Sequence, residues 1–130
     1  MLTISNASAG TIEENLAGTK APPFSAGKWV CAPPNSVGKG CFREDGDWFE
    51  IVDEKEDGHS TVVVWHSVYP RNQATVRQGL IWHTGGFQTY RWTNKNFEEG
   101  WNLEFRVCAG EYGNRHIIEN SCTQWKTTKS

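Results

Sequence analysis

A strict alternation of apolar and polar residues over 101–108 constrains the fold of this chain more than any other feature. The apolar side chains occupy every second position, at Trp101, Leu103, Phe105 and Val107. This period of two is typical of a strand that buries one face. Trp65 alternates in the same way with Thr61 and Val63. We therefore expect Trp65 and Trp101 to lie in the core.

Other segments rich in Val, Ile, Trp and Phe predict further strands. We expect them at 40–43, 47–53, 60–66, 75–83, 87–93, 115–118 and 122–125. Asp57-Gly58 and Gly85-Gly86 are hairpin signals between neighbouring strands. A helix over 12–16 would be too short to be stable by itself. About seven or eight short strands with frequent turn signals predict an all-β fold, a single antiparallel β-sandwich or a small barrel.

The chain has four cysteines, Cys31, Cys41, Cys108 and Cys122. An even number in a small chain predicts two disulfides and an oxidising compartment. Structural zinc sites place paired ligands much closer together in sequence, which argues against metal. Three connectivities are conceivable. We favour Cys31 with Cys41 and Cys108 with Cys122, because each bond would close a short loop beside a predicted strand.

The N-terminal region differs in composition from the rest of the chain. All seven tryptophans and all four cysteines follow residue 28. We therefore expect a flexible or extended arm over 1–28 and a disulfide-stapled sandwich over 29–130. The arm offers four apolar anchors for a partner protein: Ile4, Ile12, Leu16 and Phe24. Ala7-Ser8-Ala9 has the form of a signal-peptidase site. Three interpretations stay open: Met1–Ala9 is the remnant of a signal peptide, Met1 was placed on a mature chain, or the match is a coincidence in a segment rich in Ala and Ser.

Charge and hydropathy limit the classes of partner. At 130 residues the chain has the length of one domain, and its net charge of -2 gives no basic field for nucleic acid or anionic lipid. No apolar run is long enough to span a membrane. We expect neither nucleic acid nor membrane as a partner. Residues 41–57 hold eight acidic and two basic side chains, which predicts an acidic rim on the first hairpin.

The sequence carries no recognisable catalytic or metal motif. The run from Asp53 to Gly58 has Lys55 where a calcium loop of the EF-hand type needs an acid or amide. The four histidines lack the spacing of ligand pairs, and there is no G-x-S-x-G nucleophile motif. We expect no catalytic residue, no metal and no cofactor.

Two further binding hypotheses rest on particular side chains. Trp82, Tyr90 and Trp92 flank the Gly85-Gly86 turn and would form a glycan platform if their rings pointed outward together. The alternative is ordinary cross-strand packing. Lys39 lies in the Cys31–Cys41 loop and would fill a trypsin-like pocket if that loop acted as a protease inhibitor. Glycine on both sides of Lys39 makes the loop flexible there.

Several stretches also resemble a known group of proteins. They are Gly40–Phe42, Gly46–Asp53, Asp57–Ser60, Val62–Trp65 and Trp101–Cys108, with Cys122. Together they look like the small secreted β-sandwich proteins of Streptomyces and related actinobacteria. The resemblance implies secretion, disulfides and the sandwich fold. In layout alone, the chain is similar to the adaptor subunit of umbrella toxin particles, whose extended arm inserts into a lectin-like partner.

These observations predict a secreted, non-catalytic binding or adaptor protein. The sandwich would be the scaffold, and the arm would engage a secreted partner protein, such as a component of an antibacterial toxin complex. A glycan-binding module and a protease inhibitor are the alternatives.

Overall fold

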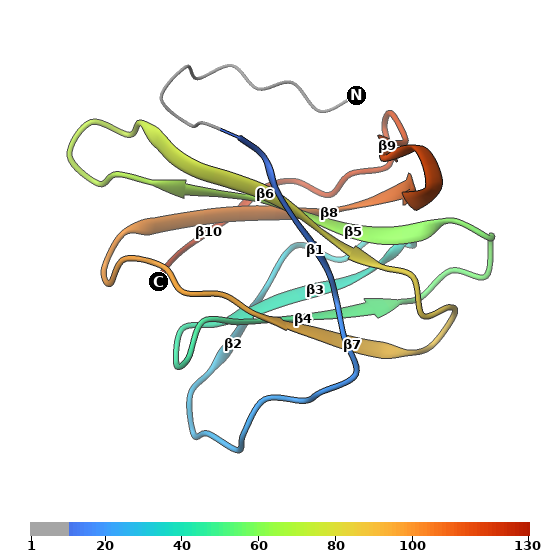
Figure 1. The fold of residues 1–130 in the computed structure, drawn as a ribbon, viewed down its shortest axis with the longest axis horizontal. Helices are drawn as coiled ribbons and strands as arrows, with labels where there is room; N and C mark the ends of the chain where they lie inside the picture. Colours follow the sequence, from blue (N-terminus) through green and yellow to red (C-terminus); the bar gives the residue numbers. More distant parts are fainter. Residues whose placement is uncertain (1–10) are drawn as a thin grey trace.

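The computed structural model describes residues 11–130, which form two β-sheets packed face to face (Figure 1). The larger sheet has the order β1 (Glu13–Leu16), β6 (Thr75–His83), β5 (Ser60–Val68), β8 (Asn102–Glu111) and β10 (Lys126–Lys129), and β9 (His116–Ile117) pairs with β8. The smaller sheet has the order β2 (Trp29–Cys31), β3 (Gly38–Arg43), β4 (Trp48–Asp53) and β7 (Tyr90–Asn94). A 3-10 turn, η2 (Tyr112–Asn114), is the only helical element among the described residues.

The predicted all-β sandwich is confirmed, with differences in its strands. Residues 11–130 contain ten strands, which is more than the seven or eight predicted. The short strands β1 and β2 account for the difference, because neither was predicted. The segment 12–16 is strand rather than helix. Every pairing is antiparallel except that of β1, which runs parallel to β6. The last strand begins at Lys126, and residues 122–125 precede it.

The two predicted hairpins at Asp57-Gly58 and Gly85-Gly86 are wrong. β4 lies in the smaller sheet and β5 in the larger one, so the loop 54–59 crosses between the sheets. The loop 84–89 crosses back from β6 to β7. Stacked sheets lie roughly 10 Å apart, a span that a loop of this length covers easily. Because both crossings leave from the same end of the sandwich, the two loops lie next to each other.

The main core lies between the sheets and is built from aromatic and branched side chains. Its largest members are fully buried: Trp65, Phe42, Phe49 and Phe105. The expectation for Trp65 is thus confirmed. Trp101 is half-buried instead, because it lies just before β8 rather than within it. Its ring makes an edge-to-face contact with the Tyr69 ring, and the two ring centroids are 5.1 Å apart.

A second cluster lies on the outer face of the larger sheet. Its strand residues are Val62, Val64, Leu80, Trp82 and Cys108, and the segment after β8 covers them through Ile117, Tyr112 and Cys122. β5 is therefore buried on both faces, which explains its continuous run of apolar residues.

Both predicted disulfides are confirmed. Cys31 and Cys41 join directly opposed positions of β2 and β3. Cys108 and Cys122 tie the C-terminal segment to β8. Two disulfides are compatible with an extracellular protein. Within residues 11–130, no helix is long and apolar enough to cross a membrane.

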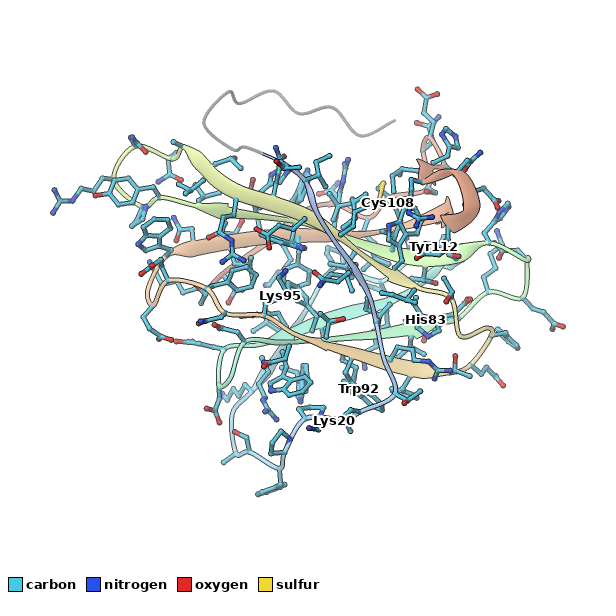
Figure 2. The ribbon with its side chains drawn as sticks, viewed as in Figure 1. Lys20, His83, Trp92, Lys95, Cys108 and Tyr112 are labelled. Carbon is cyan, nitrogen blue, oxygen red and sulfur yellow. A yellow bond between two sulfur atoms is a disulfide. The ribbon has the colours of Figure 1, made fainter. Side chains whose placement is uncertain are left out.

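The N-terminal strand β1 is held to the sandwich by charge. The Glu13 carboxylate accepts two hydrogen bonds from the Arg77 guanidinium, at 2.7 and 2.9 Å. It also accepts one from the Lys95 ammonium at 2.9 Å. The Lys95 side chain is only 8% exposed, and its ammonium lies 5.0 Å from the Trp65 ring centroid. Lys95 is labelled in Figure 2, near the gap between the two sheets.

After β1 the chain runs from one edge of the smaller sheet to the other. Gly18 exchanges backbone hydrogen bonds with Trp92 of edge strand β7, and β2 forms the opposite edge. We call residues 19–28 the strap (lower part of Figure 1). Its contacts include an Arg43 hydrogen bond to the Pro23 carbonyl at 3.0 Å. Residues 13–18 are therefore integrated in the sandwich, within the region expected to be an arm.

Candidate binding site

The two crossing loops bring the acidic run and the exposed aromatic residues together. The loop 54–59 carries carboxylates, and the loop 84–89 carries Phe87 and leads into Tyr90. A backbone hydrogen bond of 2.7 Å from the Gln88 N–H to the Asp53 carbonyl joins them. The acidic rim predicted for 41–57 is in fact divided, because β4 separates Asp53 from the β3–β4 turn at its other end.

Two hollows open at this end of the sandwich, and Asp53 and Phe87 line both. The larger has a volume of about 540 Å³ and is lined by Val52, Asp53, Glu54, Phe87, Gln88 and Tyr90. The smaller has a volume of about 220 Å³ and lies among the loop residues from Lys55 to Ser60 and from His83 to Phe87. We call the two hollows together the loop-end site.

Aromatic side chains form one wall of the loop-end site. Tyr90 is 50% exposed and Phe87 is 40% exposed. Trp92 lines neither hollow, but its ring lies beside the Tyr90 ring and nearly parallel to it, with an interplanar angle of 23° and centroids 6.3 Å apart. The indole N–H of Trp92 donates to Glu50 at 3.0 Å, which fixes the orientation of the ring. The wall therefore presents apolar ring surface to solvent beside polar groups.

The lining of the loop-end site is also acidic. Four acidic residues belong to it, at Asp53, Glu54, Glu56 and Asp57. The one lysine in this lining is Lys55, whose ammonium lies 4.0 Å from the Asp57 carboxylate. Asp53 is 4% exposed, and burial raises the pKa of its carboxyl group above the ordinary value. The hydrogen bond that it accepts from the Lys55 backbone N–H, at 3.1 Å, opposes that shift.

His83 holds the aromatic loop in shape. The Gly85 N–H donates to its Nδ1 at 3.1 Å, and its Nε2–H donates to the Thr89 carbonyl at 2.7 Å. The ring is fully buried at the end of β6 (Figure 2). Gly86 has a φ of +95°, a backbone conformation that favours glycine. A loop fixed in this way loses little entropy on binding a ligand.

Of the three aromatic residues expected to form a glycan platform, the structure brings together only Tyr90 and Trp92. Trp82 is fully buried, and its indole N–H donates to Glu14 at 3.1 Å. It belongs to the larger sheet, whereas Tyr90 and Trp92 belong to β7 of the smaller sheet. The expectation for Trp82 was wrong because the Gly85-Gly86 turn links two sheets rather than two paired strands.

The expected inhibitory loop is also corrected. Lys39 is exposed, but it lies within strand β3 and pairs with Val52 of β4. Only residues 32–37 form the loop between β2 and β3. A protease binds its inhibitor's reactive residue in an extended, accessible loop, and a paired strand residue does not offer that geometry.

The expected arm residues lie in different environments. Ile12 is half-buried against the outer cluster of the larger sheet, and Leu16 is exposed on β1. Phe24 is 97% exposed at the middle of the strap. Ile4 lies outside the described residues.

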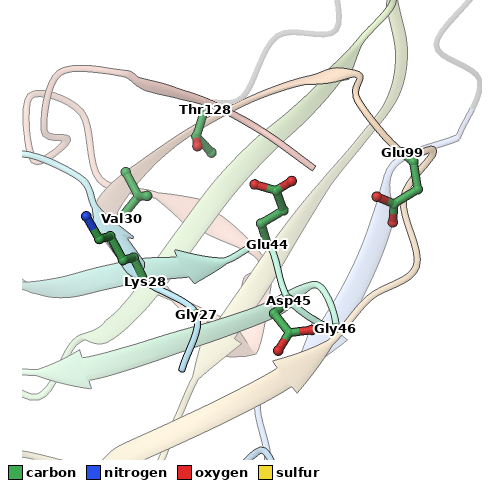
Figure 3. Close-up of a pocket in the computed structure, with 8 residues that line it drawn as sticks. All are labelled: Gly27, Lys28, Val30, Glu44, Asp45, Gly46, Glu99 and Thr128. Carbon is green, nitrogen blue, oxygen red and sulfur yellow. The ribbon is translucent and has the colours of Figure 1, made fainter. Parts of the chain in front are cut away.

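Another hollow, of about 580 Å³, lies at the opposite end of β4 (Figure 3). Its charged lining residues are Glu44, Asp45, Glu99 and Lys28. No aromatic side chain lines it. Binding pockets for organic ligands usually combine apolar walls with a few polar groups. The loop-end site therefore suits an organic ligand better than the hollow at the opposite end of β4 does.

No pattern in the sequence predicted that Phe87, Asp53 and Gln88 belong to one site. Asp53 and Phe87 are far apart in sequence, and only the pair of crossing loops joins them. The sequence held only an indirect signal for this site. An acidic loop follows one predicted strand and an aromatic loop follows another, but neither pattern shows that the two loops meet.

Comparison of the chain with protein-family models, curated proteins and solved structures found no match. The resemblance to small secreted actinobacterial proteins therefore stays a prediction. Within residues 11–130, no group of three His, Cys, Asp or Glu side chains is placed to hold a metal ion.

Proposed function

We propose that this chain is a secreted, non-catalytic binding protein that recognises carbohydrate at the loop-end site. The observation that carries the proposal is the pair of exposed rings, Tyr90 and Phe87, beside a hollow of about 540 Å³ that also contains Gln88 and carboxylates. Sugars present an apolar ring face and a rim of hydroxyl groups. Aromatic rings pack against the face, and amide and carboxylate groups bind the hydroxyls.

The rest of the molecule supports this function as a rigid scaffold. Two disulfides and two apolar clusters hold the strands from which the loops emerge. His83 fixes the loop that carries Phe87. The disulfides also support secretion, since such bonds persist in oxidising compartments.

A glycan array tests the proposal, with the unmodified protein and Tyr90→Ala applied in parallel. We expect one class of glycan to retain the protein and the substitution to weaken retention by about tenfold. Trp125→Ala is the control, because Trp125 is also exposed but precedes β10 of the larger sheet. Retention of no glycan, or equal retention of both proteins, would contradict the proposal.

One observation favours a second candidate, an adaptor that binds a secreted protein through the strap. Phe24 follows two prolines and is almost fully exposed, although burying a phenylalanine is strongly favourable in water. A stiff segment that presents one large apolar side chain resembles an anchor for a pocket on a partner.

The adaptor candidate is tested with baits in culture supernatant of the producing organism. We expect a defined secreted protein to bind the unmodified chain and not Phe24→Ala. Thr19→Ala is the control, because Thr19 is an exposed residue of the same strap, and this variant should bind normally. If the same proteins are retained by all three baits, Phe24 is not the anchor.

A further inference from the structure

We infer that the saccharide bound at the loop-end site is a cationic one, an oligosaccharide with free amino groups such as a glucosamine oligomer. This inference rests on the proposed function and concerns the class of ligand. Its basis is the combination of exposed rings with carboxylates that have no paired cation.

The charge of the lining argues for a positive ligand. Four carboxylates face one lysine around the two hollows, and that lysine already lies beside Asp57. Among the described residues, no lysine or arginine forms an ion pair with Asp53, Glu54 or Glu56. A sugar with carboxylate or sulfate groups would meet repulsion here, whereas an ammonium group would be attracted.

None of the nearby bases lines the hollow that holds Glu54. The Arg91 guanidinium keeps its charge and lies over Gly85 of the loop 84–89, where it donates to the Tyr90 carbonyl at 2.8 Å, but Arg91 lines neither hollow. His59 lines the smaller hollow, but its ring pairs with the Glu111 carboxylate. Lys39 lies on β3 and lines neither hollow.

Asp53 adds a second reason. The residue is 4% exposed and lines both hollows, and water screens a buried charge poorly. Burial opposes its ionisation, and an ammonium group in the hollow would favour it. The rings of Tyr90 and Phe87 add cation–π attraction for the same group.

Calorimetric titration of the full chain with two tetrasaccharides tests the inference. One is the tetramer of glucosamine, and the other is the tetramer of N-acetylglucosamine, which has the same backbone without the charges. At pH 6 and low salt we expect the glucosamine tetramer to bind at least about tenfold more tightly. High salt should remove most of that preference, because the attraction is electrostatic.

Two substitutions locate the effect. Glu54→Gln should weaken binding of the glucosamine tetramer by about threefold to tenfold and weaken binding of the acetylated tetramer by a smaller factor, because the acetylated sugar loses only a hydrogen-bond acceptor. Glu99→Gln removes the same charge at the opposite hollow and should change neither affinity.

The outcomes separate the two claims. Equal binding of the two tetramers, or a preference that Glu54→Gln and Glu99→Gln reduce alike, would overturn the cationic inference and leave carbohydrate binding intact. If neither tetramer binds and the glycan array is also empty, both claims fail.

Discussion

Glu13 is the residue that fastens the N-terminal strand to the sandwich. Its carboxylate bonds to Arg77 and Lys95, and these contacts lower its pKa to about 2 from an ordinary value of 4.5. The Arg77 hydrogen bond is the largest cause of that shift. The charge on Lys95 is nearly buried, so removing its partner would leave an ammonium group with one remaining hydrogen bond, to Asn15.

We predict that Glu13→Gln lowers the free energy of unfolding at pH 7 by about 2 kcal/mol. Because the folded-state pKa is depressed, the carboxylate stabilises the fold above pH 4.5. That contribution is lost as the pH falls from 4.5 toward 2. Urea denaturation of both proteins at several pH values checks this.

The exposed Glu119→Gln serves as the control and should be nearly neutral at every pH. If Glu13→Gln still had a lower free energy of unfolding than the unmodified protein below pH 2, the electrostatic explanation would be contradicted.

At the scale of elements, β1 and the two crossing loops are the features that differ most from the sequence-based prediction. β1 was not predicted because its sequence, Glu-Glu-Asn-Leu, is polar and carries no alternation of apolar residues. Its partners, Arg77 and Lys95, come from distant parts of the chain. The crossing loops were mistaken for hairpins because Asp-Gly and Gly-Gly suit both kinds of connection.

Local patterns in the sequence predicted the structure well. The strands β4, β5, β6 and β8 lie close to their predicted ranges, and both disulfides pair as expected. Tyr90 and the acidic loop were each identified separately. Their meeting at one end depends on both loops crossing between sheets, a long-range property that no local pattern encodes.

The pairing of β1 with β6 gives a prediction at this scale. A Cβ at Gly79 would lie 2.5 Å from the Glu13 carbonyl oxygen and 2.6 Å from the Trp65 ring. We expect Gly79→Ala to lower the free energy of unfolding by about 1–3 kcal/mol, because either β1 or Trp65 must move. Thermal unfolding measures the change. Gly18→Ala is a matched control with no atom within 4 Å of the new Cβ, and an equal loss in both variants would argue against a close approach at Gly79.

At the scale of the whole molecule, the two disulfides have different structural roles. Cys31–Cys41 joins neighbouring strands that already pair, whereas Cys108–Cys122 holds the segment that covers the outer cluster of the larger sheet. On the chain-entropy model each loop contributes roughly 3 kcal/mol. Loss of the second bond also loosens the cover over Trp82 and its neighbours.

We therefore predict that replacing Cys108 and Cys122 with alanine destabilises the protein more than replacing Cys31 and Cys41. Denaturant unfolding of the two double variants gives the comparison. The Cys108 and Cys122 variant should also bind more of a dye for exposed apolar surface. Equal stability of the two variants would contradict the assigned roles.

Ligand binding at the loop-end site is the central claim, and an NMR titration tests it most directly. Backbone amide shifts of the full chain would be followed as the glucosamine tetramer is added. We predict that the largest changes fall at 53–58 and 84–90, with small changes at 44–46 and 99. Changes centred on the opposite hollow or on the strap, or no change at all, would contradict the account.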